Sequence, residues 1–328
     1  MINKKAKLVK NLFSKDIKLI PTRNGYGDGV VEAGKKDKNI IVLCCDLTDS
    51  TKSGSFAKAF PDRFVEVGIA EPNMTCLAAG MALRGKIPFI SSYAMFSPGR
   101  SWEQVRTTIC YNKTNVKIVG AHAGVSVGPD GATHQAIEDI AIMRVLPTMN
   151  VIVPCDYEET KKATMAVAKL KGACYLRFAR EATPVFTTPA TPFKIGKAEV
   201  FKDGKDVTII ACGPLVYEAL KAAKELEKEK ISVRVINNHT IKPLDTKTII
   251  QSAKETGAIV TVEEHQKNGG LGSAVAECLV ENYPVPMERI GVNDRFGESG
   301  PSDVLLDIFE LTSPFIVKAV KKVLKRKA

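Results

Sequence analysis

The chain has 328 residues, of which 45% are hydrophobic and 25% charged, and its formal net charge is +11. A chain of this size buries one large core or two domain-sized ones. It contains no run of eighteen apolar residues, which argues against a membrane-spanning helix, and its N-terminus lacks the apolar core and cleavage site of a signal peptide. We therefore expect a cytoplasmic protein that makes no membrane contact.

The positive charge is concentrated at the two ends of the chain. Residues 1–18 contain six lysines and one acid, residues 318–328 contain six basic residues and no acid, and the residues between are neutral overall. A nucleic-acid-binding protein is expected to gather its basic residues on one face of the fold. Here they decorate two predicted terminal helices, so we expect solvated helix faces or docking of an acidic protein, and no nucleic-acid binding.

The eight cysteines are scattered and form no CxxC pair. Most stand in or beside apolar, strand-like runs, so they are predicted to be buried thiols in a reducing compartment. Their spacing does not match a metal site.

From residue 25 onward, predicted helices alternate with short apolar runs. The runs of the first series are NIIVLCC, KIPFIS, NVKIVGA, NVIVP and ACYLRF. Because these runs are continuously apolar, they suit parallel strands covered on both faces. The pattern predicts an α/β, doubly wound domain.

A second α/β series follows a Pro/Thr-rich connector. Its predicted helices are 215–229, 245–256 and 270–282, with a basic amphipathic helix at the end, and its apolar runs are DVTIIAC, ISVRVIN, AIVTVEE and PMERIGV. We expect a first domain over 1–182 that begins with a basic helix, a linker over 183–194, and a smaller domain over 195–328.

Residues 63–83, RFVEVGIAEPNMTCLAAGMAL, predict a strand followed by a small-residue helix. Glu71 stands at the turn between them. An acid in the first turn of a helix is common because the exposed N–H groups favour negative charge, and Pro72 also suits that position. A chemical role for Glu71 is the alternative, and this segment alone does not decide between the two.

Four other segments carry candidate chemistry. NGYGDGVVEAG and NGGLGSAV both lack the third glycine of a dinucleotide fingerprint, which argues against nicotinamide binding. The loop 120–141 holds His122, Asp130 and His134 after a predicted strand, either as a ligand site or as a plain surface loop. Tyr93 and Phe96 end another strand, where they either pack in the core or stack on a flat ring.

Five ordered motifs together resemble one family. VGIAEPNM, SSYAMFSPGRSWEQVR, GVSVGPDGATHQ, TIKPLD and EEHQKNGGLGSAVAE are similar in order and spacing to the C-terminal half of transketolase. The resemblance runs from about residue 20 to the end and implies a pyrimidine-binding domain followed by a transketolase C-terminal domain.

The resemblance implies binding of thiamine diphosphate. Glu71 matches the glutamate that hydrogen-bonds a ring nitrogen of the aminopyrimidine and favours the tautomer that removes the thiazolium proton. Such a carboxyl group needs an apolar, water-poor setting. Tyr93 and Phe96 match the aromatic residues that stack on the pyrimidine, and Asp46 matches an acid near the cofactor.

The resemblance also implies a sugar-phosphate site. Arg23, Ser50, His122 and Arg180 fall where the family grips the phosphate, a task that suits the planar fork of arginine. For Arg180, a solvated charge after a strand is the alternative. Asp130 and His134 match groups near the substrate hydroxyls and the reacting carbons, and His134 is expected to act in catalysis beside the glutamate.

The sequence departs from the family pattern in several places. Pro72 replaces the usual His or Gln, GATH replaces GPTH, and SPGRSW is one residue longer than its usual counterpart. The family holds Mg²⁺ with GDG and an Asn about thirty residues later. Here GDG at 27–29 opens a predicted helix and no matching Asn follows, so the metal ligands are expected from a partner subunit.

The sequence therefore predicts the C-terminal subunit of a split transketolase, which moves a two-carbon ketol unit between sugar phosphates. Its expected partner is an N-terminal subunit with the diphosphate-binding domain, in an α2β2 heterotetramer. Three alternatives remain: a deoxyxylulose-phosphate synthase-like enzyme, a 2-oxo-acid dehydrogenase beta subunit, and a catalytically silent scaffold.

Overall fold

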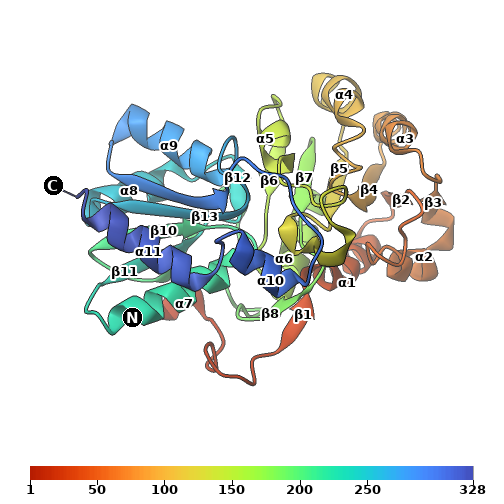
Figure 1. The fold of residues 1–328 in the computed structure, drawn as a ribbon. Coiled ribbons are helices and arrows are strands. Elements are labelled where there is room, and N and C mark those ends of the chain that lie inside the picture. The colour runs from red at the N-terminus through yellow and green to blue at the C-terminus, as the bar shows by residue number, and fades with distance from the viewer. Residues whose placement is uncertain (328) are drawn as a thin grey trace.

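The protein consists of two α/β domains side by side, as the computed structural model of residues 1–327 shows (Figure 1). Across these residues the first domain holds a seven-stranded sheet in the order β12-β6-β7-β5-β4-β2-β3, and the second holds a five-stranded sheet in the order β14-β13-β10-β11-β9. The predicted α/β architecture is confirmed.

The first sheet is parallel except at its β12 edge. Its own strands are β2 (Ile40–Cys44), β3 (Phe64–Glu66), β4 (Ile87–Tyr93), β5 (Lys117–Ala121), β6 (Asn150–Ile152) and β7 (Cys174–Arg177). β5 and β7 are buried along their whole length, and β4 is buried except at its first and last residues, as their apolar sequences require.

Helices cover both faces of the first sheet. They are α1 (Thr22–Lys36), α2 (Gly54–Ala59), α3 (Glu71–Leu83), α4 (Trp102–Gln104) with the π-helix η3 (Val105–Tyr111), α5 (Asp139–Arg144) and α6 (Tyr157–Lys169). α1 lies against α6 so closely that a Cβ on Gly25 would stand 2.3 Å from the Tyr157 carbonyl oxygen. This close approach requires glycine, so the glycine at this position has a packing role.

The GDG segment, residues 27–29, lies inside α1. A short strand, β1 (Leu19–Pro21), precedes α1, although the sequence predicted none there. It pairs with β8 (Ala182–Pro184) in a separate two-stranded sheet. α1 therefore does not follow a strand of the main sheet. Asp28 accepts a hydrogen bond from the Tyr157 hydroxyl at 2.5 Å.

The second domain is also doubly wound. Its strands are β9 (Glu199–Lys202), β10 (Val207–Ala211), β11 (Val233–Asn237), β13 (Ile259–Gln266) and β14 (Met287–Val292), of which β9 is antiparallel to its neighbour. α7 (Leu215–Glu227) and α11 (Ser313–Leu324) cover one face, and α8 (Thr246–Thr256) and α9 (Leu271–Asn282) the other. α10 (Ser302–Ile308) instead lies against the loop that follows β5, where the 3₁₀-helix η4 (Val125–Asp130) stands.

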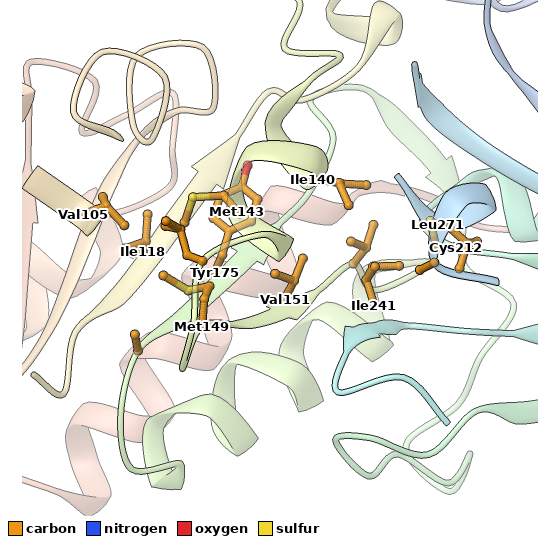
Figure 2. Close-up of a cluster of buried hydrophobic side chains, with 14 of the residues drawn as sticks. Val105, Ile118, Ile140, Met143, Met149, Val151, Tyr175, Cys212, Ile241 and Leu271 are labelled. Carbon is orange, nitrogen blue, oxygen red and sulfur yellow. The ribbon is translucent and has the colours of Figure 1, made fainter. Parts of the chain in front are cut away.

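The two domains share backbone and core. β12 (Thr240–Lys242), which follows β11 of the second domain, joins the first sheet beside β6. One hydrophobic cluster runs from Val105 through Tyr175 to Ile241 and Leu271, and therefore crosses the domain boundary (Figure 2). The domains are thus fixed against each other by apolar burial as well as by strand pairing.

The N-terminal segment corrects one prediction. The expected basic helix within residues 1–18 is wrong, because regular structure before β1 is limited, within the described chain, to the 3₁₀ turn η1 (Lys4–Ala6). The segment, red in Figure 1, lies against the second domain, where Ala6 and Leu12 enter the core and the Tyr217 hydroxyl donates to the Leu12 carbonyl at 2.9 Å. These tertiary contacts favour an extended chain over a helix.

The predicted linker is partly ordered structure. It begins in β8. Phe186 and Thr187 are buried, and their backbone N–H groups are satisfied because they donate to the Asp156 carboxylate. The seven cysteines other than Cys76 are buried thiols, and Cys76 is exposed. Among residues 1–327, no helix has the length and apolar character that crossing a bilayer requires.

Candidate functional site

The predicted site residues gather at one edge of the first sheet. Parallel strands end at the same edge, so the segments that follow them are brought together, and this edge is where open α/β sheets bind ligands. Each of the following residues comes directly after, or within a short loop of, the carboxyl end of a strand: Ser50, Glu71, Tyr93, Phe96, His122, Asp130, His134 and Arg180. Arg23 joins them from the first turn of α1.

Glu71 is the first residue of α3 and is 1% exposed. Its Oε2 accepts a hydrogen bond from Nη1 of Arg100 at 2.7 Å, and Arg100 is 47% exposed. No other side chain within residues 1–327 donates to this carboxylate. A carboxylate removed from water needs such a donor, so this ion pair holds Glu71 in its buried position.

Four rings form a cluster beside this pair. Tyr93 stacks on His122 with 3.9 Å between ring centroids and lies nearly parallel to Phe96 at 5.9 Å. His134 meets the edge of Phe96 at 5.2 Å. The Arg100 guanidinium lies 4.7 Å from the centroid of Phe96, which links the cluster to Glu71. The arrangement offers flat apolar faces next to one buried carboxylate, which suits a flat heterocycle.

The loop that carries Phe96 and Arg100 is a tight turn. The Arg100 N–H donates to the Phe96 carbonyl at 2.9 Å, and the Gly99 N–H donates to the Ala94 carbonyl at 3.2 Å. A Cβ on Gly99 would stand 2.1 Å from the Met95 carbonyl oxygen, so the turn requires glycine. The turn places Phe96 and Arg100 on the same side, toward Glu71.

His122 is buried and neutral. Its Nε2 lies 3.3 Å from Nη1 of Arg23, which can only donate, so the proton of His122 is on Nδ1. Burial, together with the charges of Arg23 and Arg180, lowers the pKa of His122 to about 3. The Nδ1 atom is buried and has no partner within residues 1–327. It is therefore a donor available to a ligand.

Two arginines flank His122. Burial and the Arg180 charge lower the pKa of Arg23, whose Nη1 donates to the Ser50 carbonyl at 3.0 Å. Arg180 donates to the Val127 carbonyl at 2.9 Å and pairs with Asp130 at 3.2 Å. Two like charges held close together favour an anion between them.

Within residues 1–327, Asp46 makes no side-chain hydrogen bond or ion pair to this cluster. Its backbone N–H donates to Oε1 of Glu66 at 2.7 Å, and its own side chain is exposed. Glu66 also accepts from the Thr48 hydroxyl and the Gly68 N–H. Sequence reasoning missed Glu66, which organises this loop.

Sequence reasoning also missed Arg100. The one available signal was a basic residue four positions after Phe96 in the lengthened SPGRSW loop. No group of three or more His, Cys, Asp and Glu side chains within residues 1–327 is arranged to hold a metal ion.

Apolar side chains are exposed beside the site. Ile69 is 73% exposed, and Leu77 and Leu83 on the outer side of α3 are 41% and 71% exposed. The residues that α3 buries are Glu71, Met74, Thr75, Ala78 and Ala79. Exposed apolar side chains beside a candidate site favour an interaction surface there.

Comparisons with known proteins agree with this architecture. Residues 18–185 match the family model described as transketolase, pyrimidine binding domain, and residues 196–316 match transketolase, C-terminal domain. The chain is 46% identical over 307 residues to the putative transketolase C-terminal section of Methanocaldococcus jannaschii, covering 93% of this chain and 96% of that protein.

Two further similarities bear on function. The chain is 42% identical over 305 residues to the 6-deoxy-6-sulfo-D-fructose transketolase subunit SqwH of Clostridium sp., covering 93% of this chain and 95% of that protein. It also matches a solved structure described as a split gene transketolase, inactive beta4 tetramer, with a TM-score of 0.88 and 48% identity, covering 94% of this chain and all of that one.

Proposed function

This chain belongs to the transketolase family and has the extent of its split C-terminal subunits, and from this premise we propose that it transfers a two-carbon ketol unit between sugar phosphates. The observation that carries the proposal is the buried Glu71 carboxylate next to the ring cluster at the sheet edge. The family depends on thiamine diphosphate, and these residues offer what its aminopyrimidine ring requires.

In this proposal Glu71 and the rings hold the cofactor's pyrimidine. Glu71 hydrogen-bonds a ring nitrogen, while Tyr93 and Phe96 provide the apolar faces on which the ring stacks. Thiamine diphosphate, when bound, supplies the electron sink that lets a carbon–carbon bond of the ketose be broken and remade. Asp46 has the weakest support, because its side chain is exposed and its backbone serves the Glu66 loop.

The phosphate of the sugar is proposed to lie between Arg23 and Arg180. Both guanidinium groups are charged, and Arg180 would exchange its Asp130 contact for phosphate oxygens. His122 contributes its free Nδ1–H as a neutral donor. His134 meets the edge of the Phe96 ring, and we propose that it acts near the reacting carbons. The Ser50 carbonyl accepts a hydrogen bond from Arg23.

The exposed face of α3 is proposed to meet the partner subunit that carries the diphosphate-binding domain. Ile69 stands two residues before Glu71 and Leu77 stands six residues after it, so a subunit docked at this end of α3 covers these exposed side chains and also closes the cofactor site. We propose that this partner supplies the Mg²⁺ ligands and that two copies of each chain form an α2β2 heterotetramer.

The solved relative described as an inactive beta4 tetramer supports a further part of the proposal: this chain is inactive without its partner. The test is to purify the chain free of any partner and assay it with thiamine diphosphate, Mg²⁺ and a ketose phosphate, before and after adding a chain with the diphosphate-binding domain. We expect ketol transfer only in the mixture. Turnover by the isolated chain at an ordinary enzymatic rate contradicts the proposed division of the site.

The same assay separates the alternatives. Pyruvate in place of the ketose is turned over by a deoxyxylulose-phosphate synthase-like enzyme or an oxo-acid dehydrogenase, and we expect no reaction with it. A scaffold subunit gives activity that survives the loss of Glu71. Because one relative is named for a sulfonated fructose, the donor panel includes a ketose with a sulfonate in place of the phosphate.

A further inference from the structure

Arg100 makes the same two contacts that the proposed function gives to the cofactor's pyrimidine ring. Its Nη1 donates to the buried Oε2 of Glu71 at 2.7 Å, and its guanidinium lies 4.7 Å from the Phe96 ring centroid. A guanidinium is flat and delocalised, donates N–H groups in its plane, and stacks on aromatic rings. An aminopyrimidine ring is likewise flat and delocalised and stacks on aromatic rings, and its ring nitrogen, once it takes up a proton, donates an N–H in the ring plane to a carboxylate.

We propose that Arg100 occupies the pyrimidine position in the cofactor-free chain and leaves when the cofactor binds. This inference rests on the proposed function of Glu71 and Phe96. It makes Arg100 a positioning residue, which keeps the buried Glu71 carboxylate paired and the Phe96 face covered until the cofactor's ring replaces it.

The surroundings of Arg100 allow this exchange. Arg100 is 47% exposed, whereas Glu71 is 1% exposed, so the arginine can return to water while the carboxylate cannot. Within residues 1–327 its side chain makes one hydrogen bond, the one to Glu71. This bond and the contact with Phe96 hold it in place, so a ring that makes both contacts can replace it.

The exchange predicts competition. While Arg100 is paired with Glu71, the ring has to break that pair before it binds, and the affinity for the ring is reduced accordingly. Removing Arg100 leaves the Glu71 carboxylate without a donor, which destabilises the free chain and strengthens binding of any ligand that restores the bond.

Trp102 provides the measurement. It is the one tryptophan of the sequence, stands two residues after Arg100, and donates from Nε1 to the Ile142 carbonyl at 2.8 Å. Its fluorescence therefore reports on the loop that carries Arg100. The probe is thiamine, which has the pyrimidine ring but no diphosphate, titrated into the isolated full-length chain and checked by calorimetry.

We expect Arg100→Ala to bind thiamine about fivefold to tenfold more tightly than the unmodified chain, since a half-exposed ion pair is worth about 1 kcal/mol. Arg100→Lys keeps the charge but not the planar stack, and its affinity should lie between the two. Arg106→Ala, an exposed arginine further along the same segment, should bind like the unmodified chain.

The double variant Glu71→Gln/Arg100→Ala completes a double-mutant cycle, which measures the coupling between these two residues. In the Glu71→Gln background, removing Arg100 should change thiamine affinity by less than twofold, because the carboxylate that held the arginine is gone. The free chain should also lose thermal stability in Arg100→Ala and regain most of it with thiamine bound.

The inference is overturned if Arg100→Ala binds thiamine equally or more weakly, or if no variant binds it, because an emptied position should accept the ring. These outcomes are distinct from failure of the proposed function. That failure appears as a Glu71→Gln complex that retains full ketol transfer, or as a partner complex that shows none, whatever the thiamine affinities are.

Discussion

Two arginine–carboxylate pairs of equal length occupy very different parts of the molecule. In the site, Arg100 lies 2.7 Å from Glu71, and at the junction of the domains Arg177 lies 2.7 Å from Asp139. Both carboxylates are buried. Arg100 is 47% exposed, whereas Arg177 is 3% exposed.

The surrounding bonds differ as well. Asp139 also accepts from the Tyr175 hydroxyl at 2.7 Å, and Arg177 also donates to the Glu264 carbonyl at 2.8 Å, so the junction pair belongs to a buried network that crosses the domain boundary. Arg100 has no such second bond within the described residues. Equal length therefore does not mean equal role: an enclosed pair fixes the fold, and a pair open to water on one side leaves room for a ligand.

The largest expected effect is on turnover and follows from changing the solvent-accessible pair, Arg100–Glu71. Glu71→Gln should lower ketol-transfer turnover of the assembled complex by about a hundredfold to ten-thousandfold, the range typical of a lost acid–base group. Steady-state kinetics measure this, and chemical denaturation of the same variant should show a nearly unchanged fold. Full turnover in Glu71→Gln, with cofactor bound, removes this residue from the chemistry.

The next largest effect is on the free energy of unfolding and follows from breaking the buried pair, Arg177–Asp139. Asp139→Ala should lower the free energy of unfolding by about 3 to 5 kcal/mol, because it leaves the Arg177 charge buried and unpaired. Urea denaturation checks this. Glu298→Ala, which breaks the exposed pair with Arg295, is the control and should cost about 1 kcal/mol or less. Similar losses of unfolding free energy in the two variants would show that the buried pair stabilises the fold no more than the exposed pair does.

A smaller effect is expected on the pH dependence of the folding stability. The folded-state pKa of His122 is lowered from 6.5 to about 3, so below pH 6.5 the unfolded chain binds a proton that the folded chain does not. Stability from this group is complete above that pH and is lost as the pH falls, with a slope of about 1.4 kcal/mol per pH unit.

Compared with His122→Asn, the unmodified chain should therefore lose more stability between about pH 6 and pH 4. Urea denaturation at several pH values measures the difference. His239, buried at the domain junction with its pKa also lowered to about 3, should behave in the same way when replaced by Asn. If the free energy of unfolding falls with pH in the same way for the variant and the unmodified chain, His122 is not buried in its neutral form.

The smallest effect is expected on the binding of the phosphorylated acceptor. Arg180→Ala should raise the half-saturating concentration of a phosphorylated acceptor by about tenfold, while that of the unphosphorylated analogue changes little, since one charge-assisted contact is lost. Initial-rate kinetics on both acceptors test this, with Lys169→Ala, on the exposed side of α6, as the control. Equal changes for both acceptors place Arg180 outside the phosphate site.

Much of the fold follows from local sequence. The continuously apolar runs predicted the parallel strands β2, β4, β5 and β7, and helical periodicity predicted α7, α8 and α9 to within two residues at each end. The same periodicity failed for the N-terminal segment. There the choice between a helix and an extended chain depends on the second domain, against which Leu12 packs.

The site shows the same division. The sequence by itself determined which residues follow the strands, and therefore that Glu71, Tyr93, Phe96 and His122 share one edge, because parallel strands all end on the same side of a sheet. Only the tertiary structure decided that Arg100 pairs with Glu71, that His122 is buried and neutral beside Arg23, and that β12 crosses to the first sheet. The physical reason is that charge pairing, desolvation and edge-strand pairing depend on distances between segments far apart in the chain, and local periodicity carries no information about those distances.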